Sequence, residues 1–108
     1  MIKIYFSPQL RNEALTVEKT NGDRLRINGE LFNFNPLNDG DVIPAGSVPC
    51  DWIVGPVENK AGVIHLTLIL PYRRSRMGVE TPEPITAEDD GEVKLPSIDE
   101  EEIANVDA

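Results

Sequence analysis

The stretch that decides the fold is DWIVGPVENKAGVIHLTLILP, residues 51–71. Alternate side chains of its second half are apolar and would share one face of a strand: Ile64, Leu66, Leu68 and Leu70. The opposite face would carry Val63, His65, Thr67 and Ile69. The turn residues NKAG, at positions 59–62, separate this strand from DWIVGPVE. The pattern predicts a hairpin whose second strand ends at Pro71.

The preceding residues predict more strands and no helix, because no window keeps a helical period over ten residues. IKIYF (2–6) alternates and is followed by Ser7-Pro8, where we expect it to end. A three-stranded meander is predicted for residues 14–34, with turns at Asn21-Gly22 and Asn28-Gly29. Residues 35–49 are rich in Pro, Gly, Asn and Asp, and predict a long surface loop. We therefore expect an all-β fold, a small antiparallel sandwich or partly open barrel of about six strands.

The charge divides the chain into two parts. Residues 1–79 hold eight acidic and nine basic residues, whereas residues 80–108 hold eleven acidic residues and Lys94. We expect a β domain at 1–72, followed at 73–108 by a short basic cluster, a Pro-containing linker and an extended acidic C-terminal arm. Such an arm repels phosphate, so we expect no nucleic-acid partner, and a basic protein surface is its natural match.

Two interpretations of the acidic arm are open. Its composition is typical of a solvated, disordered tail. Its apolar residues would instead anchor a bound arm on a partner: Val93, Leu95, Ile98, Ile103 and Val106. The second interpretation predicts that these side chains hold the arm, while its carboxylates steer association.

The chain offers few residues for chemistry. His65 is its only His and Cys50 its only Cys, and we expect a sheet residue and a small buried side chain respectively. NDGD (38–41) and EDDGE (88–92) lack the spacing of a calcium loop, so they are expected to be turns. We therefore predict no catalytic residues, no cofactor and no metal, and hence no enzyme.

Two features favour contact with other proteins. Trp52 is expected to be a core or edge anchor, with an interface anchor as the alternative, because the chain has few aromatic residues. Arg73, Arg74 and Arg76 form a cluster too small for a nucleic-acid groove and suited to an acidic neighbour. No apolar run approaches the roughly 20 residues that a membrane span needs, so we expect a soluble protein without a membrane span.

Several segments resemble one group of proteins. MIKIYFSP (1–8), NGELFNFNPL (28–37), DWIVGPVE (51–58), HLTLILP (65–71) and PEPIT (82–86) are similar to small β-rich proteins encoded in the tail and tail-fibre gene module of tailed bacteriophages and prophages. The resemblance covers about residues 1–96 and brings no catalytic residues with it. It implies a virion tail component, or a protein that helps to build one, synthesised in the host cytoplasm.

Three functions follow as hypotheses. The first is a non-enzymatic structural component of the tail tip or tail fibre, bound to other tail proteins in several symmetry-related copies. The second is a tail-fibre assembly chaperone that is absent from the mature particle. The third is an acidic inhibitor of a host defence nuclease that imitates DNA, although the acidic residues lie in an arm and not in a rigid array.

Overall fold

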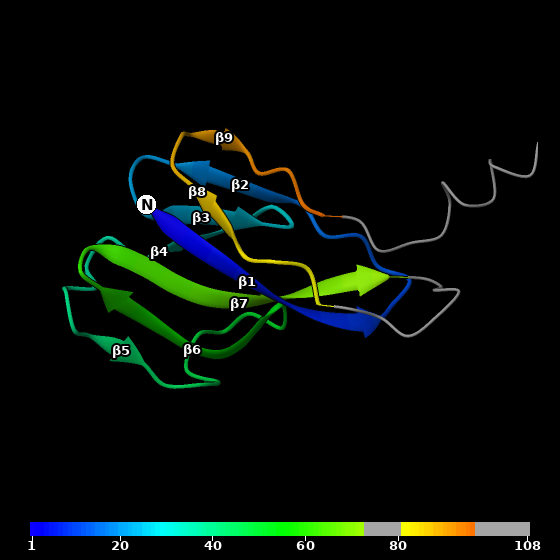
Figure 1. Ribbon diagram of the computed structural model, residues 1–108, viewed down its shortest axis with the longest axis horizontal. Coiled ribbons are helices and arrows are strands. Elements are labelled where there is room, and N and C mark those ends of the chain that lie inside the picture. Colours follow the sequence, from blue (N-terminus) through cyan, green and yellow to red (C-terminus); the bar gives the residue numbers. More distant parts are fainter. Residues whose placement is uncertain (73–80, 97–108) are drawn as a thin grey trace, which may run out of the picture.

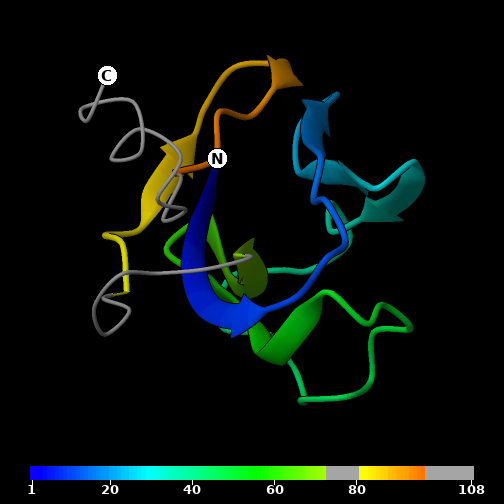
Figure 2. The ribbon, with the colours of Figure 1, turned by 90° about the vertical axis from the view of Figure 1, so that its right-hand side faces the viewer.

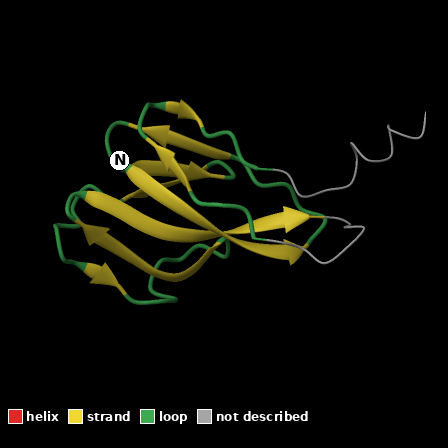
Figure 3. Cartoon of the chain, in the orientation of Figure 1, coloured by secondary structure: helices red, strands yellow, loops and turns green. Residues whose placement is uncertain are grey.

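The computed structural model describes residues 1–72 and 81–96 (Figure 1). These residues contain no helix, which confirms the all-β prediction (Figure 3). The strands that they form are β1 (Ile2–Leu10), β2 (Val17–Thr20), β3 (Arg24–Ile27), β4 (Glu30–Asn33), β5 (Val42–Ile43), β6 (Ile53–Lys60), β7 (Val63–Tyr72), β8 (Ile85–Ala87) and β9 (Gly91–Glu92). Within the same residues, no helix has the length and apolar character to cross a membrane.

The larger sheet has five strands in the order β5-β6-β7-β1-β8. The predicted β6–β7 hairpin is present, with Lys60 opposite Val63 next to the turn. β1 pairs with β7 in parallel, from Ile2 opposite Ile64 to Leu10 opposite Tyr72. The other described pairs are antiparallel, so the predicted antiparallel arrangement holds except at this central pair.

Two prolines lie inside strands where the sequence predicts that the strands end. β1 continues past Pro8 to Leu10, and β7 continues through Pro71 to Tyr72. Proline lacks an N–H and is tolerated only where a strand has a free side. β8 pairs with β1 only at Ile2–Ile4, and β6 reaches β7 no further than the bond from Ile69 N–H to the Trp52 carbonyl, at 2.8 Å. Both prolines therefore lie where one side of the strand has no described partner.

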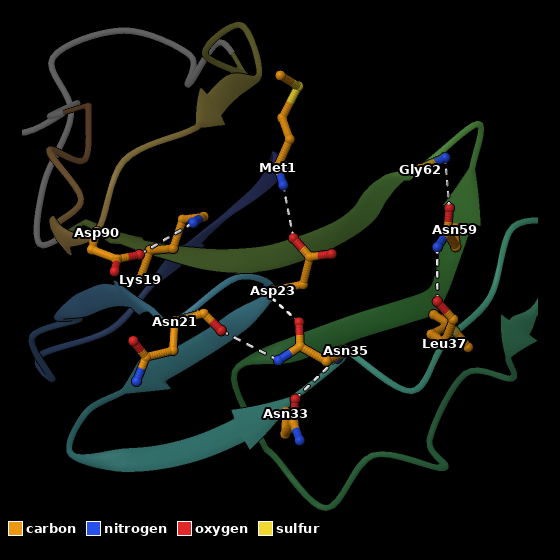
Figure 4. Close-up of polar contacts among 10 residues, drawn as sticks. All are labelled: Met1, Lys19, Asn21, Asp23, Asn33, Asn35, Leu37, Asn59, Gly62 and Asp90. Atoms are coloured by element: carbon orange, nitrogen blue, oxygen red, sulfur yellow. Dashed lines mark hydrogen bonds and ion pairs between the residues drawn. The ribbon is translucent and has the colours of Figure 1, made fainter.

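The smaller sheet has four strands in the order β4-β3-β2-β9, and its first three strands are the predicted meander. The β2–β3 turn places Gly22 at φ +85°, and a Cβ there would lie 2.8 Å from Asn35 Oδ1. The Asn35 side chain holds the turn, because Oδ1 accepts from Asp23 N–H at 2.8 Å and Nδ2 donates to the Asn21 carbonyl at 3.3 Å (Figure 4). Glycine is therefore required by both conformation and space.

The two sheets enclose one core, and an end-on view shows their strands around a common interior (Figure 2). The predicted alternation of β7 is confirmed, because its four apolar side chains at even-numbered positions are buried. Ile69, on the opposite face, is also buried, at 4% exposure. The core is completed from both sheets by Ile2, Ile4, Phe6, Val17, Leu25, Ile27, Phe32, Phe34 and Val57.

Part of the predicted linker and arm belongs to the β body. β8 pairs with β1, with Ala87 opposite Ile2 and Ile85 opposite Ile4, while β9 pairs with β2. The residues between them thus cross from one sheet to the other (Figure 1). Such short strands, with acidic residues around them, carry little local signal, and the pairing depends on partners far away in the sequence.

The stretch 35–49, predicted as a loop throughout, contains β5 and is tied to β6 by Asn59. Asn59 is 6% exposed; its Nδ2 donates to the Leu37 carbonyl at 2.8 Å, and its Oδ1 accepts from Gly62 N–H at 3.0 Å (Figure 4). Its backbone N–H donates to the Asp41 carbonyl at 3.0 Å, and its carbonyl accepts from Gly40 N–H at 2.8 Å. One residue therefore fixes both the β6–β7 turn and the start of the long loop.

We predict that Asn59→Ala lowers the free energy of unfolding by about 1–3 kcal/mol, because it removes two part-buried hydrogen bonds, to the Leu37 carbonyl and from the Gly62 N–H, each worth about 0.5–1.5 kcal/mol. Urea denaturation measures the change. Asn38→Ala is the control, since Asn38 is exposed in the same loop, and its change should stay within about 0.5 kcal/mol. Equal midpoints for the two variants would contradict this role of Asn59.

Candidate docking groove

A groove lies between the β2–β3 hairpin and the segment that follows β9. It encloses about 450 Å³, within the range of ligand-binding clefts. Its apolar lining comes from Leu15, Val17, Val93 and Leu95. Charged side chains complete it: Glu18, Arg26, Glu92 and Lys94. An apolar floor with a charged rim is the composition of a protein-binding surface.

The wall made by residues 92–95 is held by main-chain bonds to β2. Glu92 lies opposite Glu18, and Val93 N–H donates to the Val17 carbonyl at 2.9 Å. Like charges directly opposite each other destabilise a strand pair. The Arg26 guanidinium lies 3.8 Å from the Glu18 carboxylate and offsets part of this repulsion.

A buried lysine provides a second attachment. Lys19 lies on the inner face of β2 with its side chain 4% exposed, and its Nζ donates to Asp90 Oδ1 at 3.4 Å (Figure 4). Asp90 belongs to the turn between β8 and β9, and its side chain is 59% exposed. A buried ammonium without a partner is costly, so this contact favours the turn in its docked position.

A smaller cavity of about 180 Å³ adjoins the groove, since Leu15 and Leu95 line both. Arg11 lies at its other side, and the Arg11 guanidinium carbon is 5.0 Å from the centroid of the Trp52 ring. Arg11 Nε also lies 3.2 Å from Glu13 Oε1. Arg11 therefore links Trp52 to this smaller cavity through a cation–π contact.

Of the sequence-predicted partner residues that the structure describes, Val93 and Leu95 line the groove, whereas Trp52 lines a separate cavity. Trp52 is half-buried at the edge of the core, as the core-anchor interpretation expects. The Arg11 guanidinium lies over its ring. Val93 and Leu95, expected to be held by a partner, pack against this chain's own core and line the groove. The other predicted residues lie outside the described ranges: Arg73, Arg74, Arg76, Ile98, Ile103 and Val106.

Sequence reasoning missed Arg11 and Leu15 as members of this site. The inward position of Leu15 is readable from its alternation with Val17. The position of Arg11 is not readable, because it depends on the bond from Arg11 N–H to the Tyr72 carbonyl, at 2.9 Å, between residues far apart in the chain.

Cys50 and His65 line different cavities. Cys50 shares one with Trp52 and Glu30, and burial raises the pKa of its thiol above 9.0, against hydrogen bonds from the Trp52 and Ile53 backbone that lower it. His65 lies on the outer face of the larger sheet beside Tyr5. In residues 1–72 and 81–96, no group of three or more His, Cys, Asp or Glu side chains is arranged to hold a metal ion.

We predict that Asp90→Asn lowers the free energy of unfolding by about 1–3 kcal/mol, because it leaves the Lys19 ammonium buried without a charged partner. Lys19→Met should be neutral or stabilising, since an apolar side chain of similar length removes the buried charge. Urea denaturation and amide exchange at Val93 measure both effects. Asp89→Asn, in the same exposed turn, is the control and should leave stability unchanged. A Lys19→Met variant less stable than Asp90→Asn would contradict this account.

Neither protein-family models, nor curated protein sequences, nor solved structures contain a match to the chain.

Proposed function

We propose that the protein is a non-enzymatic component of a bacteriophage tail tip or tail fibre, and that it docks on other tail proteins through its β body and C-terminal arm. The resemblance of residues 1–96 to proteins of the tail gene module supports the setting. The groove supports the mode of action, because it combines an apolar floor, a charged rim and an adjoining Trp–Arg pair. Aromatic and Arg side chains dominate the binding energy of protein interfaces.

The single observation that carries the proposal is the position of the partner-binding residues expected from the sequence. Val93 and Leu95 line the groove, and Arg11 of the adjoining cavity makes a cation–π contact with Trp52. An extended segment of a partner fits such a channel, because alternate side chains enter the floor while its charges meet the rim.

The arm beyond Pro96 extends the proposed contact. It carries Ile98, Ile103 and Val106, and burying each on a partner gains about 1.5–3 kcal/mol before the cost of ordering the backbone. Exposed ion pairs contribute only about 0–1 kcal/mol each. The apolar residues of the arm therefore hold the contact, and its carboxylates steer it.

Mass spectrometry of purified virions tests the setting. We expect this chain in a few copies per particle. Its presence in infected lysate but not in particles would replace the structural role by the assembly-chaperone alternative. Its absence from both would remove the tail function.

A chain that ends at Pro96 tests the arm. It keeps all the described strands, so its urea midpoint should equal that of the full chain. We expect fewer copies per virion, because the anchors are lost. Incorporation equal to that of the full chain would show that residues 97–108 are a solvated tail.

A further inference from the structure

A bulge in β6 creates a second cavity, on the outer face of the larger sheet. Val54 lies opposite Thr67 and Glu58 opposite His65, so between these two pairs β6 has three residues where β7 has one. Gly55 permits the bend with φ +75°. Bulges of this kind redirect side chains and are common beside functional sites. The resulting cavity measures about 260 Å³ and is lined by Tyr5, Pro56, Glu58, Lys60, His65 and Thr67, together with Leu66.

Tyr5 and His65 form an ordered pair at this cavity. Their rings stack with centroids 5.8 Å apart and planes at 27°, and the Tyr5 hydroxyl is 3.0 Å from His65 Nδ1. With that hydroxyl donating to Nδ1, the imidazole proton lies on Nε2 and is free to donate to a ligand. Thr67 adds a hydroxyl on the same face, since it lies opposite Tyr5 in the parallel ladder.

Two lysines make the surroundings of the cavity positive. Lys3 lies opposite His65 in the β1–β7 ladder, and its Nζ is 5.5 Å from the centroid of the Tyr5 ring. Lys60 lines the cavity, with its Nζ 3.6 Å from Glu58 Oε1. Among the described residues, no carboxylate lies within 4.0 Å of the Lys3 ammonium. Burial lowers the pKa of His65 below 6.5, Lys60 and Lys3 lower it further, and Glu58 opposes them.

We propose that this cavity is a carboxylate-binding site, and that its occupant is the acidic β8–β9 turn of a second copy of the chain. The donors on its lining, an imidazole N–H, the Lys60 ammonium and the Thr67 hydroxyl, match a carboxylate. The Lys3 ammonium lies beside them, over the Tyr5 ring, while Glu58 on the same lining is paired with Lys60. The turn offers Glu88 and Asp89, both exposed, while Asp90 is engaged by Lys19. The cavity and the acidic turn occur on one chain, so these two surfaces of neighbouring copies are opposite in charge.

The positions of the two surfaces allow a contact between neighbours. β6 ends at Lys60, β7 begins at Val63, and β8 ends at Ala87 opposite Ile2, so site and turn belong to the same end of the larger sheet. If the turn of each copy binds the cavity of the next copy, the copies form a closed ring when the rotation between neighbours allows it. If two copies bind each other's turns, they form a two-fold dimer. Only the biological purpose of this self-association rests on the proposed function. Its test uses purified protein, so its failure is distinguishable from a failure of the virion measurement.

His65 is the only His, so one pair of imidazole NMR signals reports on the site. We expect the His65 pKa of the full chain to rise as protein concentration increases, because a carboxylate favours the imidazolium. By the same linkage, association strengthens as pH falls through the His65 pKa. Raising the salt to about 1 M, where the Debye length is about 3 Å, should remove the effect.

Charge reversal in trans identifies the occupant. A site variant (Lys3→Glu with Lys60→Glu) and a turn variant (Glu88→Lys with Asp89→Lys) should each lose self-association in analytical ultracentrifugation. A mixture of the two should regain it, because the reversed site meets the reversed turn. Glu83→Lys, which reverses an exposed charge outside both surfaces, should behave like the wild type, and unfolding curves check that all variants fold.

Each other result overturns the inference. If neither the His65 pKa nor the sedimentation of the wild-type chain depends on protein concentration, the contact does not form. A turn variant that associates as well as the wild type shows that the β8–β9 turn is not the occupant. A mixture that fails to associate, when both variants are folded, shows that the two surfaces do not meet.

Discussion

The parallel ladder between β1 and β7 is the constraint on which the rest of the structure depends. Its inward side chains, Ile2, Ile4 and Phe6 from β1 and the even-numbered residues of β7, form the floor of the core. Parallel strands cannot be joined by a tight turn and need a long crossover. Here the crossover is residues 11–62, which contain β2 to β6. The smaller sheet is thus part of the connection between two neighbouring strands, and it covers the apolar face that those strands expose.

The segment at residues 81–96 closes this arrangement. It extends the larger sheet through β8 and the smaller sheet through β9, so it joins the two layers at one side (Figure 2). The Lys19–Asp90 pair and the bond from Val93 to Val17 hold its second half. Beyond the bond from Val93 to Val17 the segment has no further main-chain bond to β2 among the described residues, and Val93 and Leu95 form one wall of the groove. The pairing that completes the fold therefore also forms one wall of the candidate site.

Local sequence predicts what is decided locally. The two Asn-Gly hairpin turns and the alternation of β7 are determined by neighbouring residues, and all of them are present in the structure. The parallel pairing of β1 and the addition of β8 are decided by residues about sixty to eighty positions away, and no short pattern encodes them. Pro8 and Pro71 were misleading for the same reason, since their tolerance depends on where neighbouring strands stop. At the site, the apolar character of Val93 and Leu95 was evident, whereas only the fold shows that they face this chain's own core.

The same parallel ladder has a consequence for how the chain folds. Each of its contacts joins residues 62 positions apart, as with Ile2 and Ile64, so a large loop must close before the central pair forms. Proteins dominated by such distant pairings fold slowly, on the scale of milliseconds to seconds. During synthesis β1 emerges before β7 and lacks this partner until β7 has left the ribosome, while the β2–β3–β4 meander is already able to form. The central β1–β7 pair, on which the finished fold depends most, is therefore among the last parts to assemble.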